Sequence, residues 1–302
     1  MAGINYVSTR GGVTSATFQD VLFEGLAPDG GLYVPEVWPV LSPELIASFQ
    51  GMTYEQVAAH VMYPFVEGTL HMVELQELTQ SAYKDFDHAA RVPIAQLSSK
   101  ALLMELYHGP TLAFKDLAMQ FIGRLFDLML GRVGRRATII GATSGDTGAA
   151  AVEAFRGLKH CDVVILYPHN RVSDVQRQQM TTASEDNVHI LAIDGTFDDC
   201  QNIVKALFGR RDFAQKVGLS GVNSINWARI MAQAVYYFTT SATLGALQSD
   251  HIRYVVPTGN FGDIFAGYVA HRMGLPMHGL VVATNANDIL ARAFHERRYV
   301  PT

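Results

Sequence analysis

The stretch of sequence that decides the fold is ATIIGATSGDTGAAAVEAFR, residues 137–156. Residues 137–141 are mostly apolar, as in a buried strand, and residues 149–156 follow as a predicted helix. Between them lies a glycine-rich loop, residues 142–148. In doubly wound α/β folds, ligands bind at the carboxyl ends of strands, where such loops lie. The stretch therefore predicts both a fold class and the place of a ligand site.

The same alternation continues on both sides of this stretch. We predict strands at residues 102–106, 137–141, 163–168, 188–193, 254–257 and 280–283. We predict helices at residues 111–130, 149–156, 173–181, 197–208, 227–247 and 264–273. Buried strands separated by helices of this length are typical of parallel sheets with helices on both faces. The fold class is therefore α/β from about residue 93 to residue 302.

Residues 1–92 have a different pattern and are predicted to form a mainly helical N-terminal domain. Short extended pieces are expected at residues 5–10 and 32–35. Helices are expected at residues 17–26, 42–49, 53–63 and 69–86, with Ser42, Thr53 and Thr69 as N-caps. The chain is thus expected to consist of two domains, residues 1–92 and residues 93–302.

The composition excludes several classes of function. The net charge is −5 with no long basic run, which argues against nucleic acid as the main partner. Cys161 and Cys200 are too few for a disulfide framework and form no metal-binding set, so a cytoplasmic location and no metal site are expected. Residues 230–249 carry no charge but contain several polar side chains, which favours a buried helix over a membrane span.

Lys115 is one of only six lysines, and it stands at the start of an apolar helical run. Phe114 precedes it, and Leu117 and Met119 follow it. Apolar surroundings and a helix N-terminus both favour a neutral amine, which is what covalent chemistry with a carbonyl cofactor requires. The alternative is a lysine whose head reaches the solvent from a half-buried helix. The segment alone favours this alternative, and only the loops described next weigh against it.

The loop at residues 142–148 is suited to an anion. Backbone N–H groups at a helix N-terminus attract negative charge, and Thr143, Ser144 and Thr147 add neutral hydroxyl donors. A carboxylate or a phosphate would fit. The alternative is a plain turn in which a side chain caps the helix.

Two further segments have the same character. In residues 258–263, Gly259 and Gly262 would let the backbone approach an anion closely, although the spacing matches neither a dinucleotide nor a P-loop motif. Residues 223–229 present amide, hydroxyl and guanidinium groups at a helix start, as a phosphate clamp would. The alternatives are a tight turn for the former and a helix cap with a solvent-facing Arg229 for the latter.

Together these segments resemble the pyridoxal-phosphate enzymes of fold type II, the tryptophan-synthase-β family, and within it the threonine synthases. The motifs that carry the resemblance are HGPTLAFKD (residues 108–116), ATSGDTG (142–148), NSIN (223–226) with Arg229, and GNFGD (259–263). YVSTRG (6–11) and GLAPDGGLYVP (25–35) are similar to the N-terminal domain of the longer, microbial and fungal type.

The resemblance implies that pyridoxal 5′-phosphate is the cofactor. Lys115 is then the Schiff-base lysine and the base that removes the α-proton. Asp146 stands at the position that faces the pyridine 3′-oxygen, where many relatives have asparagine. The implied cup for the cofactor phosphate consists of Gly259, Asn260, Phe261, Gly262 and Asp263.

The resemblance also implies the substrate, O-phospho-L-homoserine, and a β,γ-replacement that yields L-threonine and phosphate. The residues implied in binding the substrate's carboxylate or phosphate are Thr143, Ser144 and Thr147. The residues implied in holding its phosphate are Asn223, Ser224 and Arg229.

Other interpretations of the same sequence are a serine/threonine dehydratase, a phospholyase, and a non-catalytic module that binds a phosphorylated metabolite. The sequence does not indicate the oligomeric state. Members of the family continue well past residue 302, so we expect the residue that faces the pyridine nitrogen to lie beyond Thr302. On that expectation the 302 residues alone would bind the cofactor poorly and show little activity.

Overall fold

The computed structural model describes residues 3–221, 226–249 and 251–299. Its N-terminal part contains a two-stranded antiparallel sheet of β1 (Tyr6–Ser8) and β2 (Tyr33–Pro35). The helices of this part are α1 (Phe18–Glu24), α2 (Pro43–Ser48), α3 (Tyr54–Val66) and α4 (Met72–Tyr83). A mainly helical N-terminal part with little strand is therefore confirmed.

The helix starts follow local capping. Ser42 and Thr53 cap α2 and α3 through their hydroxyl oxygens, as predicted. The prediction of Thr69 as a cap is wrong, because α4 begins only after His71. There the Glu74 carboxylate accepts a hydrogen bond from the His71 backbone N–H at 2.8 Å, which satisfies one exposed donor of the helix end.

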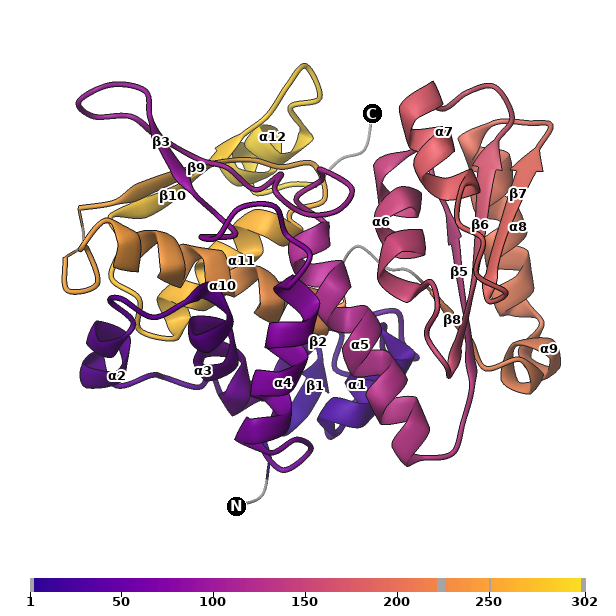
Figure 1. Cartoon of the computed structure of the whole chain (residues 1–302), viewed down its shortest axis with the longest axis horizontal. Coiled ribbons are helices and arrows are strands. Elements are labelled where there is room, and N and C mark those ends of the chain that lie inside the picture. Colours follow the sequence, from indigo (N-terminus) through magenta and orange to yellow (C-terminus); the bar gives the residue numbers. More distant parts are fainter. Residues whose placement is uncertain (1–2, 222–225, 250, 300–302) are drawn as a thin grey trace.

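The centre of the α/β part is a four-stranded parallel sheet with the order β7-β6-β5-β8. Its strands are β5 (Ala137–Ala142), β6 (Cys161–Pro168), β7 (Val188–Ile193) and β8 (Leu219–Gly221). Its helices are α6 (Asp146–Phe155), α7 (Asp174–Thr181), α8 (Phe197–Gly209) and α9 (Arg211–Lys216). Helices α6 and α8 lie on opposite faces of this sheet (Figure 1). The predicted α/β class is confirmed, whereas α9 and β8 were not predicted because both are very short.

A second group of elements lies beside this sheet (Figure 1). It contains the parallel pair β9 (Arg253–Pro257) and β10 (Gly279–Ala283), with α10 (Trp227–Thr243), α11 (Gly262–Arg272) and α12 (Ile289–Glu296). It also contains β3 (Ile94–Gln96) and β4 (Leu102–Met104), which pair antiparallel. The strand predicted at residues 102–106 is therefore not parallel, because so short a connection to β3 allows a hairpin but no crossover.

Helix α5 (Asp116–Arg132) joins the two groups and starts later than the predicted residue 111. Leu112 has a left-handed backbone (φ 61°), which interrupts the helix. The helix packs closely on α6: a Cβ at Gly123 would lie 2.3 Å from the Ala154 carbonyl oxygen. The two helices therefore touch main chain to main chain.

The N-terminal part packs directly on the α/β part. The indole of Trp227, at the start of α10, contacts the rings of Tyr6 at 6.1 Å and Phe65 at 5.3 Å between centroids. Buried residues of both parts belong to one continuous hydrophobic core. The boundary between residues 92 and 93 stays a prediction, and the core does not stop there.

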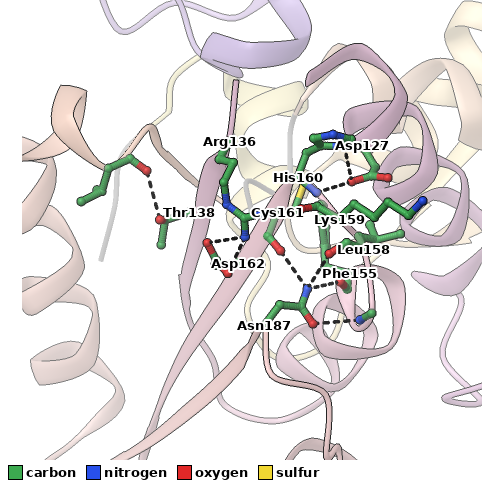
Figure 2. A network of polar contacts seen from close by, with 12 residues as sticks. Asp127, Arg136, Thr138, Phe155, Leu158, Lys159, His160, Cys161, Asp162 and Asn187 are labelled. Atoms are coloured by element: carbon green, nitrogen blue, oxygen red, sulfur yellow. Dashed lines mark hydrogen bonds and ion pairs between the residues drawn. The ribbon is translucent and has the colours of Figure 1, made fainter. Parts of the chain in front are cut away.

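A polar network fastens the amino ends of the parallel strands (Figure 2). Asn187 donates from its amide to the carbonyl oxygens of Phe155 and Cys161 at 2.9 and 2.8 Å, and it accepts from the Gly157 N–H at 2.8 Å. Asp127 on α5 accepts from the His160 N–H at 2.6 Å. These bonds tie α5, α6 and the sheet together at the end away from loop 142–148.

Candidate active site

Lys115 and Asp146 form an ion pair at the meeting point of two helix starts. The Lys115 Nζ lies 2.5 Å from the Asp146 Oδ2, and the Lys115 side chain is only 13 % exposed. The amine also lies 4.7 Å from the centre of the Phe114 ring. Apolar surroundings are thus only part of the environment, because the amine has a carboxylate partner as well.

The segment before Lys115 is held by buried and half-buried carboxylates. Asp116 is fully buried, and its carboxylate accepts hydrogen bonds from the Thr111 backbone N–H and hydroxyl, both at 2.7 Å. Burial raises the pKa of Asp116, against the effect of these hydrogen bonds.

His108 lies between two carboxylates, with Glu105 and Asp87 each 2.9 Å from one ring nitrogen. The hydrogen bond to Glu105 raises the pKa of His108, burial opposes this effect, and the bond to Asp87 adds to it. The sequence did not indicate a role for either His108 or Asp116, because their partners depend on the folded loop.

The first glycine-rich loop is organised by Thr143. Its buried hydroxyl oxygen accepts hydrogen bonds from the N–H groups of Gly145 and Gly148 at 3.0 and 2.9 Å. Gly145 has φ 149° and ψ −91°, a conformation available only to glycine. Helix α6 begins at Asp146, three residues before the predicted start, so Thr147 lies in its first turn.

The predicted substrate-binding role of this loop stays a prediction. Ser144 is exposed and Thr147 is partly exposed, so both hydroxyl groups are accessible. The Thr143 hydroxyl already holds the loop in shape, and an indirect role through the loop fits its contacts better than direct contact with a ligand.

The second glycine-rich loop leads from β9 into α11. Phe261 has a left-handed backbone (φ 63°), which is strained for a residue with a bulky side chain. The Asp263 side chain is partly buried, and its carboxylate accepts hydrogen bonds from the hydroxyls of Tyr236 and Tyr237 on α10. Burial raises the pKa of Asp263, against the effect of the tyrosine hydroxyls. An anion at this loop would therefore meet the N–H groups at the start of α11, and the carboxylate is engaged with α10.

Arg229 lies in the first turn of α10 and is only 3 % exposed. Burial lowers the pKa of its guanidinium to about 10, while Tyr236 and Asp146 oppose this effect. The interpretation of Arg229 as a solvent-facing residue is therefore wrong, because the helix buries it. Asn223 and Ser224, which were predicted beside it as substrate ligands, lie outside the described residues.

A cavity of about 230 Å³ brings Lys115, Arg229 and the second loop together. It is lined by Phe114, Lys115, Arg229, Gln233, Pro257, Thr258, Gly259, Asn260, Gly262 and Asp263. The sequence suggested two separate anion sites for Arg229 and the loop, whereas the structure places both on one cavity. Gln233 was not predicted, although its position four residues after Arg229 on a helix indicates the same face.

The cavity fits a cofactor that carries both a carbonyl group and a phosphate. A half-buried amine lies on its wall, and a glycine-rich loop at a helix start provides backbone donors for an anion. Among the residues that the structure describes, no group of three or more histidine, cysteine, aspartate or glutamate side chains could hold a metal ion.

Comparison with known families agrees with this geometry. Residues 5–83 match the family model "Threonine synthase N terminus", and residues 88–302 match "Pyridoxal-phosphate dependent enzyme". The chain belongs to the threonine synthase family of pyridoxal-phosphate dependent enzymes.

Three members of the threonine synthase family illustrate the similarity. The chain is 52 % identical to the threonine synthase of Pseudomonas aeruginosa over 296 residues, which cover 98 % of the chain and 63 % of that protein. A threonine synthase structure from Brucella melitensis with bound pyridoxal phosphate has a TM-score of 0.94 at 52 % identity, covering 97 % of the chain and 63 % of that one. The threonine synthase structure from Escherichia coli has a TM-score of 0.86 at 34 % identity, covering 99 % of the chain and 68 % of the Escherichia coli chain.

The chain spans 63 % of the length of the Pseudomonas aeruginosa relative and 60 % of the Schizosaccharomyces pombe threonine synthase, to which it is 44 % identical. In the described part of the chain, no helix has the length and apolar character needed to cross a membrane.

Proposed function

We propose that the protein converts O-phospho-L-homoserine and water into L-threonine and phosphate, with pyridoxal 5′-phosphate as cofactor. The observation that carries this proposal is the single cavity lined by a half-buried amine, a buried arginine and a glycine-rich loop. Membership of the threonine synthase family supports the same reaction. Two buried free cysteines, Cys161 and Cys200, are consistent with a cytoplasmic location.

Each part of the site has a task in this reaction. When bound, the cofactor supplies an electron sink for the charge left at Cα of the substrate. Lys115 would hold the cofactor, and its amine, once released from the cofactor, would take the proton from Cα and return protons later. Asp146 lies 2.5 Å from this amine and keeps it oriented. The N–H groups at residues 259–263 bind the cofactor's phosphate.

Arg229 is proposed to bind the substrate's phosphate and to balance its charge as it leaves Cγ. Water then adds at Cβ, so the products are threonine and inorganic phosphate. Ser144 and Thr147 present hydroxyl donors for the substrate's carboxylate, on the loop that Thr143 holds in shape. Asn223 and Ser224 are proposed beside Arg229 from the sequence alone.

The test is a phosphate-release assay with O-phospho-L-homoserine on the full-length protein, in which threonine is measured in parallel. Equal amounts of phosphate and threonine support the proposal. Turnover of threonine or serine without use of phosphohomoserine would indicate a dehydratase, and phosphate release without threonine would indicate a phospholyase. Binding without any turnover would indicate a non-catalytic module.

A further inference from the structure

Gln233 is a buried polar side chain whose surroundings in the protein do not satisfy it. It lies on α10 and is only 2 % exposed. Its Oε1 atom is buried and has no hydrogen-bond partner among the residues that the structure describes. Buried amide groups almost always have a partner, because losing water without replacement is unfavourable. The missing partner of Gln233 is therefore to be sought in the cavity that it lines.

The position of Gln233 along α10 indicates which part of the cavity it serves. Arg229 lies one helical turn before it, and Tyr236 and Tyr237 lie one turn after it. The hydroxyls of these tyrosines bind Asp263 in the first turn of α11. Gln233 thus stands between the buried arginine and the second glycine-rich loop.

The second loop carries no cationic side chain that would favour an anion, and its side-chain donors are Thr258 and Asn260. Residues 258–263 include no lysine or arginine, and the Asp263 carboxylate is engaged by the tyrosines. The two ends of a glutamine amide are interchangeable by rotation, so Gln233 can turn its NH₂ group into the cavity. This neutral donor would add to the backbone N–H groups of the loop and to the side chains of Thr258 and Asn260.

We infer that the Gln233 amide donates a hydrogen bond to the phosphate of the cofactor at loop 258–263. The inference rests on the proposed function, because it assumes that pyridoxal phosphate occupies this cavity. It gives Gln233 a binding role that neither the motifs nor the family resemblance assigned to it.

The test compares pyridoxal phosphate with pyridoxal, which has the same ring and carbonyl group but no phosphate. Dissociation constants for both are measured by absorbance for the parent protein and for Gln233→Met, which keeps the length and loses the amide. A hydrogen bond to a charged phosphate corresponds to about a ten- to hundredfold change in affinity. We expect Gln233→Met to weaken binding of pyridoxal phosphate by about this factor and to leave binding of pyridoxal unchanged.

Gln120→Met is the matched control. Gln120 is a 3 % exposed glutamine on α5 that also has an unsatisfied amide atom, but it does not line the cavity. Its replacement should leave the ratio of the two dissociation constants unchanged. If Gln233→Met does not fold, Gln233→Glu serves instead, because an added negative charge should weaken the binding of pyridoxal phosphate much more than the binding of pyridoxal.

The outcomes separate this inference from the proposed function. If the parent binds pyridoxal phosphate and the Gln233 variants leave the ratio at its parent value, the inference is overturned and the proposed function stands. If the variants weaken the binding of both compounds equally, the inference is also overturned, since the amide would then act on the ring or on the shape of the cavity. A full-length parent protein without measurable binding of pyridoxal phosphate contradicts both.

Discussion

Replacing Arg229 with methionine should change stability and phosphate binding in opposite directions. The guanidinium is 3 % exposed, and burial lowers its pKa from 12.5 to about 10. Because one pKa unit corresponds to about 1.36 kcal/mol, the charged arginine destabilises the folded protein by about 3 kcal/mol relative to the unfolded chain. This destabilisation is present at neutral pH, because Arg229 is charged in the folded and in the unfolded state. It disappears only as the pH rises above about 10, where the folded-state guanidinium loses its proton.

Methionine is unbranched, apolar and similar in length, so it fills the space without the charge. We expect Arg229→Met to raise the free energy of unfolding of the cofactor-free protein by about 1–3 kcal/mol in urea titrations. The same change removes a charge-assisted bond to phosphate, which is worth about 1.5–3 kcal/mol. The KM for O-phospho-L-homoserine should therefore rise by about ten- to a hundredfold, with little change in affinity for pyridoxal phosphate.

Arg124→Met is the control for this experiment. Arg124 is a partly buried arginine on α5 that donates to Gln120 and Ser81 and does not line the cavity. Its replacement should leave the KM unchanged. An Arg229→Met protein that is less stable than the parent would refute the reasoning, because contacts of the guanidinium would then outweigh its burial. Loss of cofactor affinity at constant KM would place Arg229 at the cofactor's phosphate instead.

Three further predictions address the rest of the structure. Lys115→Ala should abolish turnover, and borohydride should no longer fix the cofactor covalently; labelling of a different lysine in the parent would disprove the assignment. Burial raises the pKa of Asp116 above 3.8 in the folded protein. The stabilisation from the protonated carboxyl is therefore fully present below pH 3.8 and is lost as the pH rises through the folded-state pKa. Urea titrations from pH 3.5 upward, roughly to pH 7, should show this loss in the parent and not in Asp116→Asn; identical profiles would contradict it. Asn187→Ala removes four hydrogen bonds and should lower the free energy of unfolding by about 2–4 kcal/mol in denaturant titrations, whereas a change below about 0.5 kcal/mol would show that water replaces them.

The positions of the loops could be predicted from the sequence because their signals are local. A run of apolar residues, a glycine-rich loop and a helix follow one another within residues 137–156, and the structure has β5 and α6 there. The same holds for β9, the second loop and α11. Such loops lie at the carboxyl ends of their strands, so the pattern located each loop. It did not locate the two loops relative to each other, because β5 and β9 belong to different sheets.

The partners of the site residues could not be predicted, because they depend on how distant elements pack. Lys115 and Asp146 are 31 positions apart and meet only because α5 and α6 start at the same place. The later start of α5 depends on the turn that Asp116 makes with Thr111, which overrides the apolar periodicity. The only sequence signal of Gln233 is its spacing of four residues from Arg229, and a glutamine on a buried helix becomes informative when the structure shows its unsatisfied oxygen.

The close contact at Gly123 has a consequence for how the site moves. With no side chain between the α5 glycine and the Ala154 carbonyl of α6, no rotamer change can alter the spacing of the two helices. Their amino ends carry Lys115 and Asp146. Farther along, the Asp127–His160 bond ties α5 to the segment between α6 and β6. The two helices should therefore rotate and shift as one rigid body. Thermal motion of the surrounding core would then displace the amine and its carboxylate together and leave the distance between them unchanged.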